Sequence, residues 1–159
     1  MNYIDILRKT KGIGSARRAK AFGVDRNVRR MYPRERQGMK HVLVVEDSSM
    51  TRSMIRSVLE EIGDIETVEA ASGFEALKIL PTQDFQMVIT DINMPDINGL
   101  ELINFIRRNE RFREIPLMII STEKSEEDKR RGIALGANAY LTKPFTVEAL
   151  TNAVKSLIA

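Results

Sequence analysis

The sequence contains no cysteine and a single histidine, His41, among its 159 residues. The absence of thiols excludes a disulfide framework and a thiolate metal site, and one imidazole is too few for a multi-histidine metal site. No apolar run approaches the roughly 18 residues that a membrane-spanning helix needs. The first residues also lack the basic region and apolar stretch of a secretory signal. We therefore expect a soluble protein of the cytoplasm.

Positive charge is scarce outside the first quarter of the chain. Residues 1–40 hold 12 Lys and Arg against 3 Asp and Glu, a charge of +9, whereas residues 41–159 hold 13 against 19, a charge of −6. The sequence pI of 9.3 therefore belongs to the start of the chain, and the remainder is acidic. A high pI alone is no reason to expect that the whole molecule binds nucleic acid.

Residues 1–38 form a basic N-terminal extension with few large apolar side chains. Three glycines interrupt any helix there, and Pro33 ends one. Three interpretations stay open. The segment is a solvated tail, or an arm that binds an acidic partner, nucleic acid or an anionic membrane, or the result of a gene start placed too early, since Met39 directly precedes a strand pattern. Nucleic acid is expected as a partner only through this segment.

The acidic part of the chain alternates between strand and helix patterns. Apolar runs predict strands at 41–45, 65–70, 85–90, 116–120 and 137–141. Helical spacing with capping residues predicts helices that begin at 48 or 49, 73, 99, 125 and 146. Five strand–helix units in succession are typical of an α/β fold, a doubly wound five-stranded parallel sheet with helices on both faces.

Polar side chains follow four of the five predicted strands. Glu46 and Asp47 follow the first strand, Asp91 the third, Ser121 and Thr122 the fourth, and Thr142 and Lys143 the fifth. In parallel sheets ligands bind beyond the carboxyl ends of the strands. One polar strand end means little, because strand ends meet water. Four ends with complementary chemistry predict a site.

The residue types at this edge suit phosphoryl transfer. Two carboxylates about 4 Å apart repel by about 4 kcal/mol at an effective dielectric constant near 20, so Glu46, Asp47 and Asp91 would keep a proton or bind a cation. An all-oxygen ligand set favours Mg²⁺. Lys143 adds a positive charge and Ser121 a hydroxyl donor for phosphoryl oxygens, and Asp91 would be the nucleophile.

These motifs together resemble those of a known family. Residues 39–159 resemble the receiver domain of two-component response regulators, of the stand-alone chemotaxis type. The resemblance rests on Val44–Ser48, Asp91–Pro95 with Gly99, Ile120–Thr122, and Gly136–Ala137 through Tyr140 to Lys143-Pro144-Phe145. It implies the flavodoxin-like strand order 2-1-3-4-5.

The resemblance also implies roles for individual residues. Asp91 would accept a phosphoryl group from a sensor histidine kinase. Asp47, Asp91 and the backbone carbonyl of Asn93 would bind Mg²⁺, with Glu46 helping through water. Ser121 would then move to the phosphoryl group and Tyr140 would swing inward. A target protein would recognise the change at the fourth helix, fifth strand and fifth helix.

Three further expectations concern tuning and flexibility. Asn93, Thr122 and Glu123 occupy positions at which the family adjusts dephosphorylation, and the resemblance implies a cis peptide between Lys143 and Pro144. From the residues themselves, the predicted helix 125–135 has apolar side chains only at its end, so we expect it to be weakly held.

Two alternatives from other functional classes compete with a signalling switch that is not an enzyme. An aspartyl-phosphate phosphatase or mutase of the haloacid-dehalogenase-like type would need a second acid two residues after the nucleophile, where this chain has Asn93. A DNA-binding regulator would use residues 1–38 and would bind with a steep salt dependence.

Overall fold

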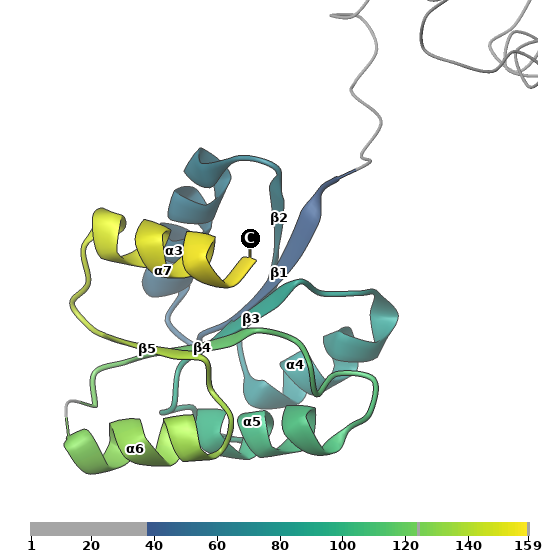
Figure 1. Cartoon of the computed structure of the whole chain (residues 1–159), viewed down its shortest axis with the longest axis vertical. Helices are drawn as coiled ribbons and strands as arrows, with labels where there is room; N and C mark the ends of the chain where they lie inside the picture. Colours follow the sequence, from purple (N-terminus) through teal and green to yellow (C-terminus); the bar gives the residue numbers. More distant parts are fainter. Residues whose placement is uncertain (1–37, 124, 159) are drawn as a thin grey trace, which may run out of the picture. The chain divides into compact units, whose positions relative to one another are not determined.

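A five-stranded parallel sheet forms the centre of the unit that the structure describes (Figure 1). The computed structural model describes residues 38–123 and 125–158, so the expectations for the basic extension lie outside the described residues except at Gly38. The strand order is β2-β1-β3-β4-β5, which confirms the predicted topology. The strands are β1 Lys40–Val45, β2 Ile65–Ala70, β3 Met87–Thr90, β4 Leu117–Ser121 and β5 Ala139–Thr142.

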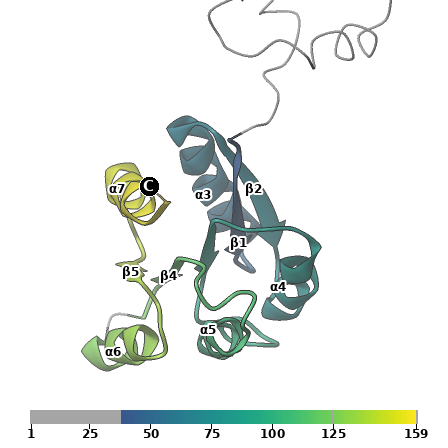
Figure 2. The same cartoon turned by 45° about the vertical axis from the view of Figure 1, so that its right-hand side comes forward.

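Helices cover both faces of the sheet, as Figures 1 and 2 show. α3 and α7 lie on one face, and α4, α5 and α6 lie on the other. The helical elements are α3 Ser49–Ile62, α4 Gly73–Ile79, the short 3-10 helix η1 Leu80–Thr82, α5 Gly99–Arg108, α6 Glu126–Ala134 and α7 Val147–Ile158. No helix in the described part of the chain is both long and apolar enough to cross a membrane.

Each face of the sheet carries its own hydrophobic core. In β1, Val42 and Val44 pack in the core shared with α3 and α7, while Leu43 and Val45 pack in the core shared with α4 and α5. All four side chains are fully buried. A strand covered on both faces is apolar throughout, which explains why the sequence shows continuous apolar runs rather than alternation.

Side chains cap the helices at the positions that the sequence indicated. Ser48, Ser72 and Ser125 each accept a hydrogen bond from the backbone three residues later, at 3.3, 3.1 and 3.1 Å respectively. Asn98 and Glu101 form a reciprocal capping box at the start of α5. Such caps satisfy backbone N–H groups that the first helical turn leaves unpaired.

A few element boundaries differ from prediction. The predicted third strand begins at Met87 rather than Phe85, and the fifth spans Ala139–Thr142 rather than 137–141. By contrast, α4 ends at Ile79, before Pro81, as expected, and Pro81 lies in the first turn of the short 3-10 helix η1, where its missing N–H costs no hydrogen bond. The Lys143–Pro144 peptide bond is cis, as the resemblance implied.

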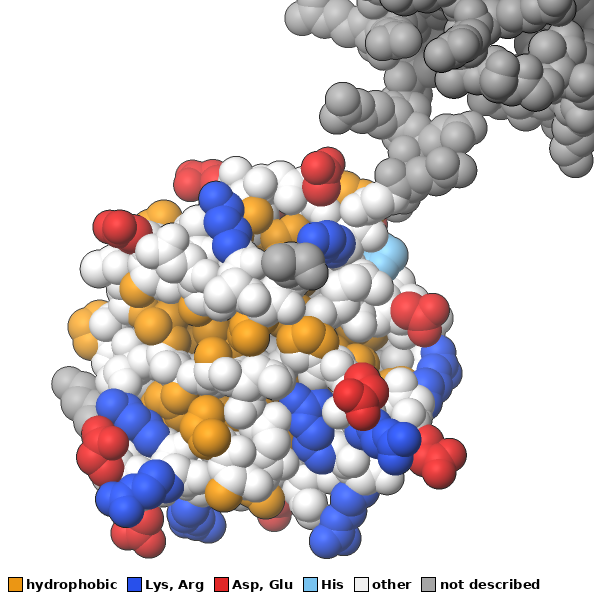
Figure 3. All heavy atoms as spheres, in the orientation of Figure 1, with side chains coloured by type: hydrophobic (Ala, Val, Ile, Leu, Met, Phe, Trp, Pro, Cys, Tyr) orange, Lys and Arg blue, Asp and Glu red, His pale blue; other side chains and the backbone are white. Residues whose placement is uncertain are grey.

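The helix α6 is held less firmly than the others. Gly132 is its only buried residue, and Ile133 and Leu135, at and beyond its end, are 48% and 36% exposed. Beside it, all four residues of the edge strand β5 are half-buried. Figure 3 shows hydrophobic side chains across the middle of the surface that faces the viewer in Figure 1, between the levels of α7 and α6. Few buried apolar contacts make α6 the helix most easily displaced.

Candidate functional site

Three carboxylates meet at the carboxyl ends of β1 and β3. The two strands are direct neighbours, with Val45 opposite Thr90, so the residues that follow them emerge side by side. Glu46, Asp47 and Asp91 each place a carboxylate oxygen within 4.8 Å of the others. Glu46 and Asp91 are only 2% and 7% exposed, whereas Asp47 is exposed to solvent. The predicted acidic cluster therefore forms, with one open side.

Lys143 bridges the two buried acids. Its ammonium nitrogen lies 2.7 Å from Glu46 Oε2 and 3.0 Å from Asp91 Oδ2. Its backbone N–H donates to the carbonyl of Ser121 at 2.8 Å, which fixes the start of the loop after β5. Burial by itself lowers the pKa of Lys143, but the hydrogen bonds from its ammonium to Glu46 and Asp91 outweigh burial and raise it. Lys143 is therefore a permanent cation at the site.

Glu46 is held from several sides. Its Oε1 accepts a hydrogen bond from the backbone N–H of Ser48 at 3.0 Å, and its backbone carbonyl accepts one from Arg52 at 2.7 Å. Burial raises the pKa of the Glu46 carboxyl, against the lowering influence of Lys143 and Ser48. The raised pKa therefore reflects mainly the removal of this carboxyl from water.

The backbone after β3 fixes the orientation of Asp91. Its Oδ1 accepts hydrogen bonds from the N–H groups of Ile92 at 2.6 Å and Asn93 at 3.3 Å, which leaves Oδ2 toward Lys143. Gly99 packs directly against this turn: a Cβ there would lie 2.8 Å from the Asp91 carbonyl carbon and 2.9 Å from the Ile92 Cα. Only glycine allows so close an approach.

Glu123 connects the predicted switch and tuning residues. The Asn93 side chain donates to Glu123 Oε1 at 2.8 Å, and the Glu123 backbone N–H donates to Ser121 Oγ at 3.3 Å. The Tyr140 hydroxyl donates to the Glu123 carbonyl at 2.8 Å. Ser121 is fully buried, and Thr122, which follows it, is exposed. The loop after β4 thus links the Asp91 loop to β5.

The donor set fits a small hard cation. Every side-chain ligand candidate is a carboxylate oxygen, and the exposed Asp47 gives an entry route from solvent. Mg²⁺ prefers oxygen ligands and retains several waters, so a half-open cluster of three acids suits it. The predicted fourth ligand, the carbonyl of Asn93, lies in the loop directly beyond Asp91, and the Asn93 side-chain amide is turned toward Glu123.

Two supporting residues were missed from the sequence. Arg52 contacts the backbone of Glu46, and Asp96 accepts a hydrogen bond from the Phe74 backbone N–H at 2.8 Å, which ties the Asp91 loop to α4. The sequence did contain a clue to Arg52. The helix dipole favours acidic residues in the first turn of a helix, yet the first turn of α3 has no acidic residue and contains Arg52 instead. Nothing comparable marked Asp96.

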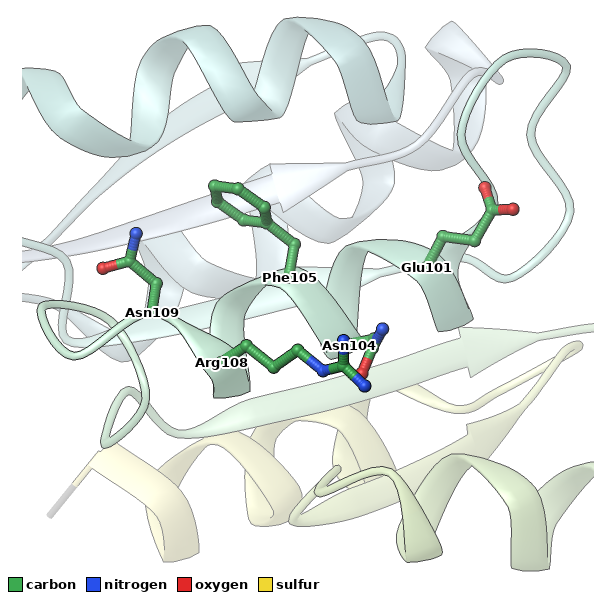
Figure 4. Close-up of a pocket in the computed structure, with 5 residues that line it drawn as sticks. All are labelled: Glu101, Asn104, Phe105, Arg108 and Asn109. Carbon is green, nitrogen blue, oxygen red and sulfur yellow. The ribbon is translucent and has the colours of Figure 1, made fainter.

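A surface hollow of about 350 Å³ lies on the outer face of α5 (Figure 4), lined by Glu101, Asn104, Phe105, Arg108 and Asn109. None of these is a predicted site residue. This hollow is therefore separate from the acidic cluster.

Comparisons with known proteins show which family the chain is similar to. The model of the response regulator receiver domain matches residues 42–155. The chain is 40% identical over 110 residues to the chemotaxis protein CheY1 of Helicobacter pylori, a match that covers 69% of this chain and 89% of that protein. It is 31% identical over 116 residues to the chemotaxis protein CheY of Pseudomonas aeruginosa, covering 73% and 94%.

Solved structures of response regulators are also similar to this chain. The crystal structure of Vibrio cholerae chemotaxis response regulator CheY4 is similar with a TM-score of 0.70 and 35% identity, over 75% of this chain and 98% of that one. The phosphorylated cyanobacterial phytochrome response regulator RcpA is similar with a TM-score of 0.66 and 26% identity, over 74% and 89%.

Proposed function

Because the chain belongs to the response regulator receiver family, we propose that it is a phosphorylation-activated switch of a two-component system, with Asp91 as phosphoacceptor and a sensor histidine kinase as donor. One observation supports this most directly: Lys143 Nζ lies 3.0 Å from Asp91 Oδ2, beside a cluster of three carboxylates. A nucleophile, a fixed cation and a cation-binding acid pair are the parts that phosphoryl transfer needs.

In the proposed acceptor step, a carboxylate oxygen of Asp91 attacks phosphorus and forms an acyl phosphate. The bond from phosphorus to the donor breaks, and the donor leaves with the electron pair. Lys143 would turn from the carboxylates to the phosphoryl oxygens, and the Ser121 hydroxyl would donate to one of them. Burial of Asp91 strengthens both interactions, because water is largely excluded.

The acids beside Asp91 would bind the metal cofactor. Glu46, Asp47 and Asp91, together with the carbonyl of Asn93, would hold Mg²⁺, which when bound neutralises charge on the phosphoryl oxygens. The three carboxylate oxygens that lie within 4.8 Å of one another support this placement of the cation.

The proposed output is a change of binding surface. Movement of Ser121 toward the phosphoryl group would break the hydrogen bond that its hydroxyl accepts from the Glu123 N–H. The carbonyl of the same residue accepts the hydrogen bond from Tyr140. Because α6 buries only Gly132, a small shift of the loop before it would displace the helix. A target protein in the cytoplasm would then recognise α6, β5 and α7. We propose no turnover of a diffusible substrate, only self-phosphorylation and slow loss of the phosphoryl group.

The test is incubation of the full chain with Mg²⁺ and a small-molecule phosphodonor, read by mass spectrometry. Wild type should gain one phosphoryl group, and Asp91→Asn should gain none. Asp47→Asn is the matched comparison: it should still be phosphorylated, but only at much higher Mg²⁺. Equal labelling of Asp91→Asn and wild type would refute the assignment. Sustained hydrolysis of generic phosphate esters by wild type would instead favour a phosphatase.

A further inference from the structure

We infer that Arg52 is a positioning residue for the cation site: its guanidinium holds the backbone that carries Glu46 and Asp47, and thereby raises the affinity of the site for Mg²⁺. The inference rests on the proposed function in one respect, the need for Mg²⁺. It goes further by assigning a role to a cation that touches none of the predicted ligand oxygens.

Two contacts fix the Arg52 side chain. One guanidinium nitrogen, Nη1, donates to the backbone carbonyl of Glu46 at 2.7 Å, and Nε lies 3.6 Å from Glu69 Oε1 on the edge strand β2. The side chain is 19% exposed. Arg52 therefore links the beginning of α3 to the end of β1 and to β2, and the Glu46–Asp47 turn lies between these elements.

The position of this arginine calls for an explanation. The first turn of α3 contains no acid, although the positive end of a helix dipole favours acids there and disfavours cations. A cation also lies close to a site that must attract Mg²⁺. Both effects act against Arg52, so what it contributes is the hydrogen bond to Glu46 and the ion pair with Glu69.

In the Glu46–Asp47 turn, all the other anchoring contacts are made by Glu46. Glu46 is anchored by its N–H to the Ala70 carbonyl at 3.0 Å, by Ser48 and by Lys143. Asp47 is exposed, and its side chain makes no hydrogen bond within the described part of the chain. Its direction thus depends on the peptide plane that it shares with Glu46, and the oxygen of that plane is the one that Arg52 binds.

Positioning and simple electrostatics predict opposite signs. If Arg52 acted only as a nearby positive charge, its removal would make the site more negative and Mg²⁺ would bind more tightly. If Arg52 acts by holding the ligand turn, its removal loosens the ligands and Mg²⁺ binds more weakly. Loss of a group that orients metal ligands lowers affinity by about tenfold or more.

The experiment is an MgCl₂ titration of the metal-free full chain, followed through the NMR amide shifts of Asp47 and Asn93. Arg56→Gln is the matched control, because Arg56 pairs with the same Glu69 at 3.3 Å and with Glu60, but has no bond to Glu46. We expect about tenfold weaker binding for Arg52→Gln, and a change of about twofold or less for Arg56→Gln, whose ion pairs are half-exposed.

A second variant and a second readout keep the outcome interpretable. Arg52→Lys keeps the charge and one donor, so we expect intermediate affinity, and it serves as the test if Arg52→Gln does not fold. Unchanged or tighter Mg²⁺ binding in both Arg52 variants would overturn the inference. Phosphorylation of wild type at saturating MgCl₂ is measured in a separate experiment. If wild type is not phosphorylated, the proposed function is refuted. The Mg²⁺ affinities of wild type and the Arg52 variants would still decide the role of Arg52.

Discussion

The Tyr140 hydroxyl donates a hydrogen bond to the backbone carbonyl of Glu123, at 2.8 Å. The resemblance implied a tyrosine that swings inward upon phosphorylation, yet this side chain is half-buried and bonded to the loop after β4. The same loop residue donates its N–H to Ser121 and accepts the Asn93 amide. Tyr140 is thus connected to the Asp91 loop through one residue.

This connection predicts the behaviour of Tyr140→Phe. The variant keeps the ring and loses the hydrogen bond to Glu123, so Asp91 should accept a phosphoryl group at the wild-type rate. The change in α6 should be smaller, because loop and strand are no longer joined. Hydrogen exchange of residues 125–135, measured with and without a small-molecule phosphodonor, tests this. A wild-type exchange difference in the variant would show that the bond transmits nothing.

The Tyr140 phenol should lose its proton at a higher pH than a free tyrosine does. Burial raises the pKa of its phenol above the usual value of about 10, and the nearby charges of Asp128, Glu123 and Asp91 add to the shift. Because the folded-state pKa exceeds the unfolded one, the associated stability is complete below the unfolded pKa and is lost as pH rises toward the folded pKa. Ultraviolet titration of wild type against Tyr140→Phe would isolate this phenol, and a pKa at or below that of free tyrosine would contradict the prediction.

The bond between Asn93 and Glu123 should control how long the phosphoryl group survives. It joins the loops on the two sides of Asp91, across a sequence separation of 30 residues. Glu123→Ala removes the acceptor and opens the site to water, so we expect faster loss of the phosphoryl group. Glu123→Gln keeps an acceptor oxygen and should resemble wild type. Decay of the phosphorylated species, followed by mass spectrometry, compares them. Equal lifetimes for the alanine variant and wild type would exclude such a gate.

The sequence predicted the sheet more completely than it predicted the site. The bounds of β2, Ile65–Ala70, were predicted to the residue, because turn formers flank an uninterrupted strand pattern. The strand ends of β1 and β3 identified the acids because topology alone brings them together. The bonds made by Glu123 and Arg52 depend on side-chain directions between separate elements, and no local spacing encodes those directions.

Boundaries next to proline and glycine were also only partly predictable. The end of α4 before Pro81 follows the usual rule, but the 3-10 turn η1 that comes next was not predicted; such a turn accepts proline at its start. Gly99 was read as part of a family motif. Its physical reason, contact with the Asp91 backbone, appears only in three dimensions.

Removal of the bridging ammonium should destabilise the protein unless Mg²⁺ is present. Lys143→Met leaves Glu46 and Asp91 buried without a cation, and breaking a buried ion pair in this way typically costs about 3 kcal/mol or more in free energy of unfolding. Mg²⁺ can replace the lost charge, so it should stabilise the variant more than wild type. Urea unfolding with and without MgCl₂ measures both effects. A variant as stable as wild type without Mg²⁺ would show that the bridge contributes little.

The contact between Gly99 and the Asp91 turn predicts that even a small substitution at Gly99 damages the protein. An added Cβ at Gly99 would meet backbone atoms of Asp91 and Ile92, and α5 cannot retreat because Leu102, Ile103 and Ile106 are fully buried. Overpacking typically costs about 1–3 kcal/mol and occasionally more, so Gly99→Ala should lower the free energy of unfolding by an amount near the upper end of this range. The variant should also be phosphorylated more slowly, since Asp91 would shift.

Gly132→Ala in α6 is the matched control. Its Cβ would meet the Ile119 side-chain tip at 2.5 Å, and a methyl group can move aside. In addition, alanine favours the helix by about 1 kcal/mol over glycine. The control should therefore lose little stability and keep its phosphorylation rate. Equal losses for the two variants would mean that the close packing of Gly99 against the acceptor loop has no special role in holding Asp91.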